Sequence, residues 1–327
     1  MSPRRAAKPR APKRILITGI AGSIGRALWR RLVERKGIEL IGVDVRNWLL
    51  DRPPNFQFIQ VDINRNRAED IFRTVKPHTL VHLAFQSDQA VKKGRRHNTN
   101  VIGTQRVLGY CSKYGVKKVI VVSQHQVYGA SPGNPSLITE DMPLKAAATR
   151  GELGDLIEFD HICHSWMYEH GRTPLVLLRP VFALGPNVRS GFLYQYLNLP
   201  RAPVAMGFNP MLQILHEDDV AEAISCALKA RARGIYNVTG SSSIPLLRLL
   251  KELHIPSYPV PHPLLYKGDE ILFRLRLSRV PPGSMQFLQY NCVVNGERIR
   301  RQLGYEPVRS LGETLSHFSR THSAVIA

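Results

Sequence analysis

The sequence has no long hydrophobic run. An uninterrupted apolar stretch of about 18 residues, the length that a membrane-spanning helix needs, is not found among the 327 residues. The amino-terminal segment is basic but lacks the apolar segment of a secretory signal. With 43% hydrophobic and 21% charged residues, the composition is also unlike that of a disordered chain. We therefore expect a soluble, cytoplasmic protein that does not span a membrane.

Cysteine is scarce, and its spacing excludes the common metal and redox motifs. The four cysteines are Cys111, Cys163, Cys226 and Cys292. Because they are scattered along the chain, they predict free thiols in a reducing compartment and no metal site. The alternative that the spacing leaves open is metal binding by His161, Cys163 and His164.

Acidic residues are absent from the first 14 positions, which hold six basic residues and three prolines. This composition predicts a disordered basic arm over residues 1–13. The remaining +14 of the +20 net charge (20 minus 6) is spread along the chain, with no recognisable RNA- or DNA-binding module. We therefore do not expect nucleic-acid binding as the main role, although a basic surface would attract a phosphate-bearing substrate.

What the sequence does contain is a glycine-rich turn directly after a short apolar run. Residues 18 to 25 read TGIAGSIG. Gly19, Gly22 and Gly25 would allow a tight turn, close approach to a pyrophosphate, and close packing of the next helix on the sheet. That helix would begin near Ser23 and direct unpaired N–H groups at the phosphates. The pattern predicts dinucleotide binding, with a purely structural turn as the alternative.

A second apolar stretch supports this interpretation. Residues 40 to 44 read LIGVD and end in a carboxylate about 20 residues beyond the glycine turn, where NAD ribose hydroxyls are bound in such folds. The Asp44 carboxylate would repel a 2′-phosphate, which favours NAD over NADP. Arg46 lies close enough in sequence to weaken that preference.

The order of apolar and amphipathic stretches predicts the fold class. Their alternation through the first 180 residues is typical of repeated βαβ units, so we expect an α/β fold with a doubly wound, Rossmann-like parallel sheet of at least six strands. The predicted strands are 14–18, 39–45, 56–61, 79–84, 117–123 and 175–179. The predicted helices of this part are 23–36, 66–75, 97–114 and 152–170.

Beyond residue 179 the connections become rich in proline and glycine, which indicates a smaller lobe. Here we expect a helix at 217–231, a strand at 235–238 and a helical region near 295–303. The predicted division of the chain is the arm at 1–13, the dinucleotide-binding domain at 14–184, and a mainly substrate-binding lobe at 185–327. Some elements of that lobe are expected to return to the first domain.

Over roughly residues 13 to 315 the chain resembles the extended short-chain dehydrogenase/reductase family, the NAD-dependent nucleotide-sugar epimerases and dehydratases. Besides the glycine turn, the matching pieces are VDI at 61–63, VHLA at 81–84, NVIGT at 100–104, the stretch from Ser123 to VYG at 127–129, LRP at 178–180, GP at 185–186, HEDDVA at 216–221, YNV at 236–238 and LGYEP at 303–307. The resemblance implies bound NAD and a substrate such as a nucleotide sugar or another phosphorylated compound. It also implies a homodimer.

The cofactor-binding residues that this resemblance and the patterns above suggest lie in the glycine turn and the helix start after it, at or just after the carboxyl ends of later strands, and in the helical stretch at 97–114. They are Gly19, Gly22, Ser23, Ile24, Gly25, Asp44, Asp62, Ile63, Leu83, Ala84, Asn100, Ser123 and Val181. Asp62 would accept the adenine amino group or form an Asx turn, and both uses are compatible. Leu83 is equally well explained as plain core. Asn100, placed in a helical stretch, is expected to tie its side chain to the neighbouring strand.

The resemblance breaks where the family's chemistry is carried. Family members use a Tyr-x-x-x-Lys pair in which the lysine lowers the pKa of the tyrosine so that it moves a proton. The expected positions fall near Glu152 and Leu156, and residues 150 to 166 contain neither Tyr nor Lys. The Ser or Thr expected four residues before Tyr128 is Gln124. We therefore expect non-standard or lost oxidoreductase chemistry, with a non-catalytic, dinucleotide-binding regulatory or scaffold protein as the alternative.

Two neighbouring residues are the remaining catalytic candidates. Ser123 stands beside the expected position, but strand alternation should turn its side chain to the opposite face. His125 stands at the strand end where the nicotinamide should lie and could exchange protons near neutral pH without a lysine. A basic group after the fourth strand could bind a diphosphate or simply be solvated. Its members are Lys92, Lys93, Arg95 and Arg96.

Overall fold

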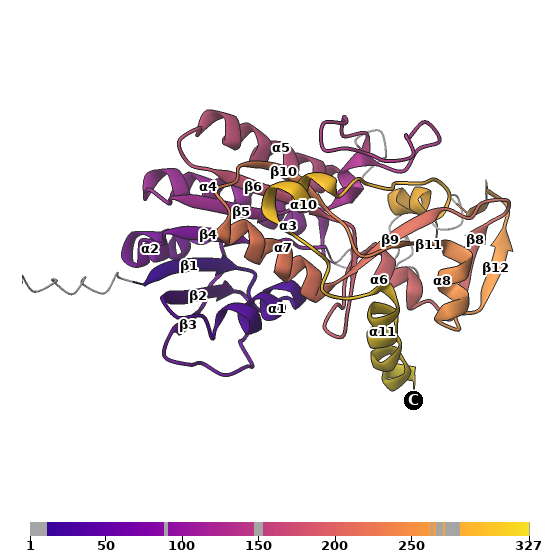
Figure 1. The fold of residues 1–327 in the computed structure, drawn as a ribbon, viewed down its shortest axis with the longest axis horizontal. Coiled ribbons are helices and arrows are strands. Elements are labelled where there is room, and N and C mark those ends of the chain that lie inside the picture. Colours follow the sequence, from indigo (N-terminus) through magenta and orange to yellow (C-terminus); the bar gives the residue numbers. More distant parts are fainter. Residues whose placement is uncertain are drawn as a thin grey trace, which may run out of the picture.

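A computed structural model describes residues 12–87, 91–146, 153–262, 264–265, 271 and 282–326 (Figure 1). Its central sheet has seven parallel strands in the order β10-β6-β5-β4-β1-β2-β3. The strands are β1 (Lys13–Thr18), β2 (Ile38–Asp44), β3 (Phe56–Gln60), β4 (Thr79–His82), β5 (Lys118–Val122), β6 (Leu175–Pro180) and β10 (Gly234–Val238). The doubly wound, Rossmann-like sheet that the sequence predicts is confirmed.

Helices cover both faces of this sheet. The apolar sides of α1 (Ser23–Leu32) and α7 (Glu217–Lys229) pack on one face. The other face carries α2 (Asn66–Val75), α4 (Gly103–Lys113) and α5 (Gly154–Glu169). Each of these helices buries an apolar stripe against β-branched strand residues, which is what fixes the layers.

The chain returns to the large sheet after building part of the second lobe. β10 lies beside β6, with Gly234 opposite Val176 and Val238 opposite Pro180. This strand and α7 come from beyond residue 184 in sequence, yet they complete the dinucleotide-type sheet. The boundaries proposed above for the domains stay a prediction.

The second lobe is built from short elements. Its three-stranded sheet has the order β11-β9-β7, and a separate pair joins β12 to β8. These elements are β7 (Phe182–Leu184), α6 (Phe192–Leu197), β8 (Ala202–Ala205), β9 (Met211–His216), β11 (Ser243–Pro245), α8 (Leu246–Glu252) and β12 (Ser257–Val260). The carboxyl-terminal part adds η4 (Pro282–Leu288), α10 (Glu297–Leu303) and α11 (Leu311–Ile326).

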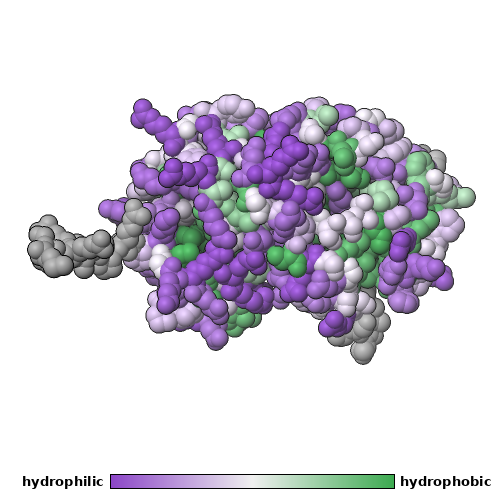
Figure 2. Space-filling model, in the orientation of Figure 1, coloured by the Kyte–Doolittle hydropathy of each residue, from purple (hydrophilic) through white to green (hydrophobic). Residues whose placement is uncertain are grey.

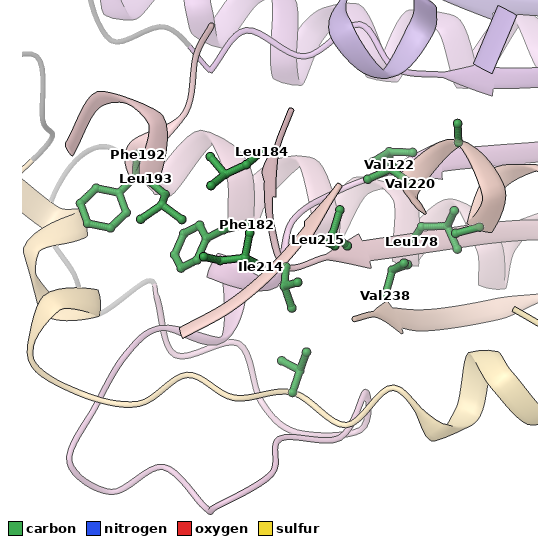
Figure 3. Packing of buried hydrophobic residues seen from close by; sticks show 14 of the residues in the cluster. Val122, Leu178, Phe182, Leu184, Phe192, Leu193, Ile214, Leu215, Val220 and Val238 are labelled. Carbon is green, nitrogen blue, oxygen red and sulfur yellow. The ribbon is translucent and has the colours of Figure 1, made fainter. Parts of the chain in front are cut away.

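One apolar core runs through both parts of the molecule (Figure 3). Val122 and Leu178 extend it from the large sheet, and Phe182, Leu184 and Ile214 continue it into the small sheet. The surface differs between the parts in Figure 2, where hydrophilic residues cover much of the large-sheet side and hydrophobic ones gather over the second lobe. Exposed large hydrophobic residues of that lobe include Met206, Leu247 and Tyr258.

Several predicted bounds differ from the structure. The helix predicted over 23–36 ends at Leu32. The stretch predicted as one helix over 97–114 begins instead in α3 (Lys93–His97) and passes through a π-helical turn, η1 (Asn98–Ile102), before α4. The long helix α11 was not predicted. Of the predicted basic arm, residues 1–11 lie outside the described residues, and Lys13 already belongs to β1. None of the described helices is long and apolar enough to cross a membrane.

Candidate functional site

The glycine turn after β1 is packed backbone against backbone. Gly19 has a φ of +72°, and a Cβ added there would lie 2.7 Å from backbone atoms of Leu83 and Ala84. A Cβ on Gly25 would lie 2.3 Å from the Ile20 carbonyl oxygen. The turn therefore presses α1 against β1 and brings the loop after β4 alongside, as a dinucleotide-binding turn requires.

The first turn of α1 faces the same place. Gly22 is the N-cap, and within the described chain no side chain caps the helix or places an acid in its first turn. Ser23, Ile24 and Gly25 supply the first backbone N–H groups. The partial positive charge of this helix end suits an anion such as a pyrophosphate.

Asp44, at the end of β2, projects its carboxylate into this turn. The residue is 5% exposed, and its Oδ2 accepts a 2.9 Å hydrogen bond from the backbone N–H of Ala21. Arg46 holds the same carboxylate through its backbone N–H and its guanidinium, the nearest guanidinium contact being 3.1 Å. The acid predicted for the ribose thus lies beside the glycine turn, and an arginine lies on it.

Asp62 and Ile63 follow β3. Asp62 Oδ1 accepts hydrogen bonds from the backbone N–H of Asn64 at 2.9 Å and from its side-chain amide at 3.1 Å, which is the Asx turn expected as one alternative. Ile63 is buried, and its side chain fills the space where a Cβ on Gly103 would stand. Contact of Asp62 with adenine stays a prediction.

Asn100 positions the loop that passes the glycine turn. It is 1% exposed, its Oδ1 accepts from the backbone N–H of Gln86 at 2.7 Å, and its amide donates to the Gln86 carbonyl at 3.1 Å. The side-chain tie expected for Asn100 therefore reaches the loop just beyond β4. Leu83 and Ala84 in that loop are partly buried against the core.

A buried polar network that the sequence did not predict lies beneath the expected reaction site. Asp160 on α5 is fully buried and forms an ion pair with Arg179 of β6, with Nη2 to Oδ1 at 2.6 Å. Arg179 donates to the Tyr128 hydroxyl at 2.8 Å, which donates to Asn237 at 2.8 Å. Ser123 donates to Asp160 Oδ2 at 2.8 Å. The only signal in the sequence was the arginine in the otherwise apolar stretch at 175–180.

This network decides where two hydroxyl groups point. The Ser123 side chain is 2% exposed and turned toward α5, where it donates to Asp160, and its catalytic role stays a prediction. Burial, the largest cause, raises the pKa of Tyr128 to about 12. Tyr128 therefore stays protonated at neutral pH.

His125 is enclosed by aromatic rings. It is 2% exposed, and its ring meets Phe182 edge to face with a centroid separation of 4.5 Å and Phe287 at 6.0 Å. Burial lowers the pKa of His125 to about 4, against a smaller opposing effect from a hydrogen bond with the Pro180 backbone. The imidazole is thus neutral at neutral pH and packed as core. Its catalytic role stays a prediction.

Of the two positions near which the resemblance expects the tyrosine and lysine, the structure describes only Leu156. Leu156 on α5 is 3% exposed and belongs to the same core as Phe182. Glu152 lies outside the described residues. Gln124, in the place of the hydroxyl residue, is partly buried. Val181 is buried and pairs its backbone N–H with the Val238 carbonyl at 3.0 Å.

The four basic residues after β4 differ in burial and do not form one cluster. Arg96 is 5% exposed and pairs with Asp155 at 3.2 Å, which ties α3 to the start of α5. Lys92, Lys93 and Arg95 are exposed. Among the described residues, no three His, Cys, Asp or Glu side chains are grouped to hold a metal ion, and Cys163 is fully buried whereas His161 is exposed.

Two cavities lie away from the glycine turn. One of about 600 Å³ lies between β3 and α2 and includes Phe58 and Arg67 in its wall. The other, about 320 Å³, is lined by the loops at 131–136 and 207–210 and by residues 289–291. Neither touches the residues assigned to the cofactor.

Solved structures with this fold include nucleotide-sugar enzymes. A UDP-glucuronic acid 4-epimerase from Bacillus cereus, solved with UDP-glucuronic acid and NAD, is 18% identical with a TM-score of 0.71, covering 95% of this chain and 99% of that one. A dTDP-glucose 4,6-dehydratase from Bacillus anthracis, solved with NAD, is 18% identical with a TM-score of 0.73, covering 95% and 97%. At these identities the likeness shows the fold.

Sequence comparison adds relatives that match most of the chain or part of it. An uncharacterized protein of Mycobacterium tuberculosis is 26% identical over 319 residues, covering 95% of this chain and 85% of that protein. A UDP-glucuronate 4-epimerase of Thermodesulfobacterium geofontis is 29% identical over 167 residues, which is 45% of this chain and 50% of the enzyme. The model of the NAD dependent epimerase/dehydratase family matches residues 15–239, and this chain therefore belongs to that family.

Proposed function

We propose that this protein binds NAD at the glycine turn and that the family's tyrosine–lysine proton transfer is absent from it. The observation that carries the first half is the fit of the turn. A Cβ on Gly19 or Gly25 would overlap backbone atoms, and Asp44 reaches the same turn. NAD, when bound, supplies a hydride acceptor at its nicotinamide. The residues of the turn bind and orient its adenosine diphosphate part.

The second half rests on the side chains around the expected nicotinamide. Ser123 is engaged with Asp160, His125 is neutral within aromatic rings, and Leu156 is buried near the position where the resemblance expects lysine. Of these three residues only His125 has a side chain that titrates near neutral pH when unperturbed, and burial lowers its pKa to about 4, below the neutral range that favours proton transfer. A dinucleotide-binding regulatory or scaffold role follows from this arrangement.

Retained chemistry with a different proton carrier is the second candidate, because His125 stands directly after β5. A nucleotide sugar or another phosphorylated compound would then be the substrate, in keeping with what the related enzymes bind and with the basic charge of the chain. A homodimer and a cytoplasmic setting complete this proposal. The four free, buried cysteines support a reducing compartment.

Two measurements test the proposal. NAD and NADH titrations followed by calorimetry should give saturable binding, and NAD at a hundredfold excess over its Kd should stabilise the fold by about 2.7 kcal/mol. Absence of saturable binding would refute the first half. Incubation with UDP-glucose and UDP-glucuronic acid should yield neither NADH absorbance nor an epimer. Turnover that disappears in His125→Ala would replace the non-catalytic role with the second candidate.

A further inference from the structure

The carboxylate of Asp44 has no acceptor capacity left in this structure. An ionised carboxylate offers about four lone-pair sites. Oδ2 accepts from the Ala21 backbone N–H at 2.9 Å and from Arg46 Nη2 at 3.1 Å, and Oδ1 accepts from the Arg46 backbone N–H at 2.9 Å and from its Nε at 3.1 Å. Two ribose hydroxyls would therefore have to displace the Arg46 guanidinium before they could donate to Asp44.

The guanidinium is placed to meet a ligand as well as the acid. The Arg46 side chain is 59% exposed, whereas the Asp44 side chain is 3% exposed. Its Nη2 lies 3.4 Å from the point where a Cβ on Gly22 would stand, so it lies over the glycine turn. Guanidinium carries five N–H donors in a fork that matches phosphate oxygens, and Nε and Nη2 contribute to the contact with Asp44.

A lone carboxylate at this place selects against a 2′-phosphate by charge repulsion. Here the repulsion is offset, because the acid is already paired with a cation that lies on the solvent side of it. The Asp44–Arg46 pair can therefore bind either a ribose hydroxyl or a 2′-phosphate. For a ribose hydroxyl the guanidinium swings away and frees the carboxylate, and for a 2′-phosphate it stays and donates to the phosphate oxygens.

Resting on the proposed function, we infer that Arg46 determines coenzyme selectivity and allows this site to bind NADP as well as NAD. Asp44 alone predicts strong preference for NAD. The Asp44–Arg46 pair reduces that preference, since the competing guanidinium weakens the hydroxyl contact and creates a phosphate contact. Arg46 thus acts on the adenosine end of the ligand and is independent of any chemistry at the nicotinamide.

The test compares NAD and NADP binding in the full chain and in Arg46→Ala, by calorimetry. The wild-type affinities should agree within about tenfold, and Arg46→Ala should weaken NADP by roughly tenfold to a hundredfold, the worth of a charge-assisted contact. NAD affinity should stay the same or rise. Arg52→Ala serves as the matched control, because this exposed arginine of the same loop contacts the Phe58 ring and not Asp44, and both affinities should be unchanged.

The outcomes separate this inference from the proposed function. If neither NAD nor NADP binds, the proposed function fails. If NAD binds but the wild type rejects NADP by more than about a hundredfold, or if Arg46→Ala weakens both ligands equally, the inference is overturned while the function stands. ADP-ribose and its 2′-phosphate, which lack nicotinamide, should reproduce the same pattern, and a pattern seen only with the intact coenzymes would contradict the placement of Arg46 at the ribose.

Discussion

At the scale of the residue, Gly25 is required by contact and not by backbone conformation, since it is not among the residues with positive φ. An alanine Cβ would lie 2.3 Å from the carbonyl oxygen of Ile20 and 2.7 Å from that of Gly19, and backbone atoms cannot turn aside. We expect Gly25→Ala to lower the free energy of unfolding by about 1–3 kcal/mol. It should also weaken NAD binding at least about tenfold, because α1 must move off the turn.

The control for this change is Gly109→Ala on α4, where no heavy atom of the described chain would lie within 4 Å of the added carbon. Urea unfolding should show it to be neutral or stabilising by up to about 1 kcal/mol, as expected for alanine in a helix. Equal losses of stability in the two variants would contradict the assignment of the cost to the turn.

Two buried histidines, His125 and His82, make the free energy of unfolding depend on pH. The pKa of His125 is lowered by burial from 6.5 to about 4. Between these values the unfolded chain binds more protons than the folded one, so the free energy of unfolding falls as the pH falls through this window. The loss is about 1.4 kcal/mol per pH unit for each such histidine. Burial lowers the pKa of His82 similarly, also to about 4.

The measurement is urea unfolding at a series of pH values between 6.5 and 4. His125→Asn should show a shallower decline than the wild type, because one of the protonation steps is removed. Identical slopes in the two proteins would show that His125 is not buried and neutral in the folded state.

Single residues differ in how well the sequence predicted them. The positions of Gly19, Gly25 and Asp44 follow from local spacing, because a turn between a strand and a helix is a local structure. The ion pair of Asp160 with Arg179 joins α5 to β6 through tertiary packing, and no spacing rule predicts which buried acid meets which arginine. The hydrogen bonds from Arg46 to Asp44 were indicated only by the closeness of the two residues in the sequence.

At the scale of the element, length decides what could be predicted. The helix over 66–75 matched the structure because ten residues suffice to show an amphipathic period. Strands such as β7 and β11 have three residues each, too few to show alternation, and their partners lie far away in sequence. The missed helix α11 does show an apolar spacing at Leu311, Leu315 and Phe318, and its packing onto β9 explains that spacing.

Phe318 should therefore anchor α11. It is 3% exposed in the main core, and Phe318→Ala should lower the free energy of unfolding by about 3–5 kcal/mol, the usual cost of removing a buried ring. Tyr168→Ala on α5 removes a ring that is 70% exposed and should change stability by less than about 0.5 kcal/mol. Denaturant unfolding of both variants measures the difference, and a small effect at Phe318 would mean that α11 contributes little to the fold.

At the scale of the whole molecule, the chain has the family's fold, and we propose that the family's tyrosine–lysine proton transfer is absent from it. The glycine turn and Asp44, the predicted cofactor site, adjoin the seven-stranded sheet. Leu156 belongs to the core that joins the two sheets, and His125 packs against Phe182 of the same core. The proposed binding of the adenosine part and the proposed loss of proton transfer depend on different side chains and on opposite ends of the dinucleotide, so one structure can accommodate both.

The net charge of +20 is a property of the whole chain, and it predicts how the protein meets polyanions. We expect weak, sequence-independent binding to duplex DNA, with a Kd of about 10⁻⁴–10⁻⁶ M at physiological salt.

Deleting residues 1–11 removes four basic residues and leaves β1 intact. The slope of log K against log salt should then become shallower by up to about 4, since each released counterion contributes nearly one unit. Fluorescence anisotropy with a labelled duplex measures this slope, and NAD affinity in the same deletion variant should be unchanged. Tight, sequence-selective DNA binding that survives the deletion would contradict the assignment of this charge to non-specific attraction.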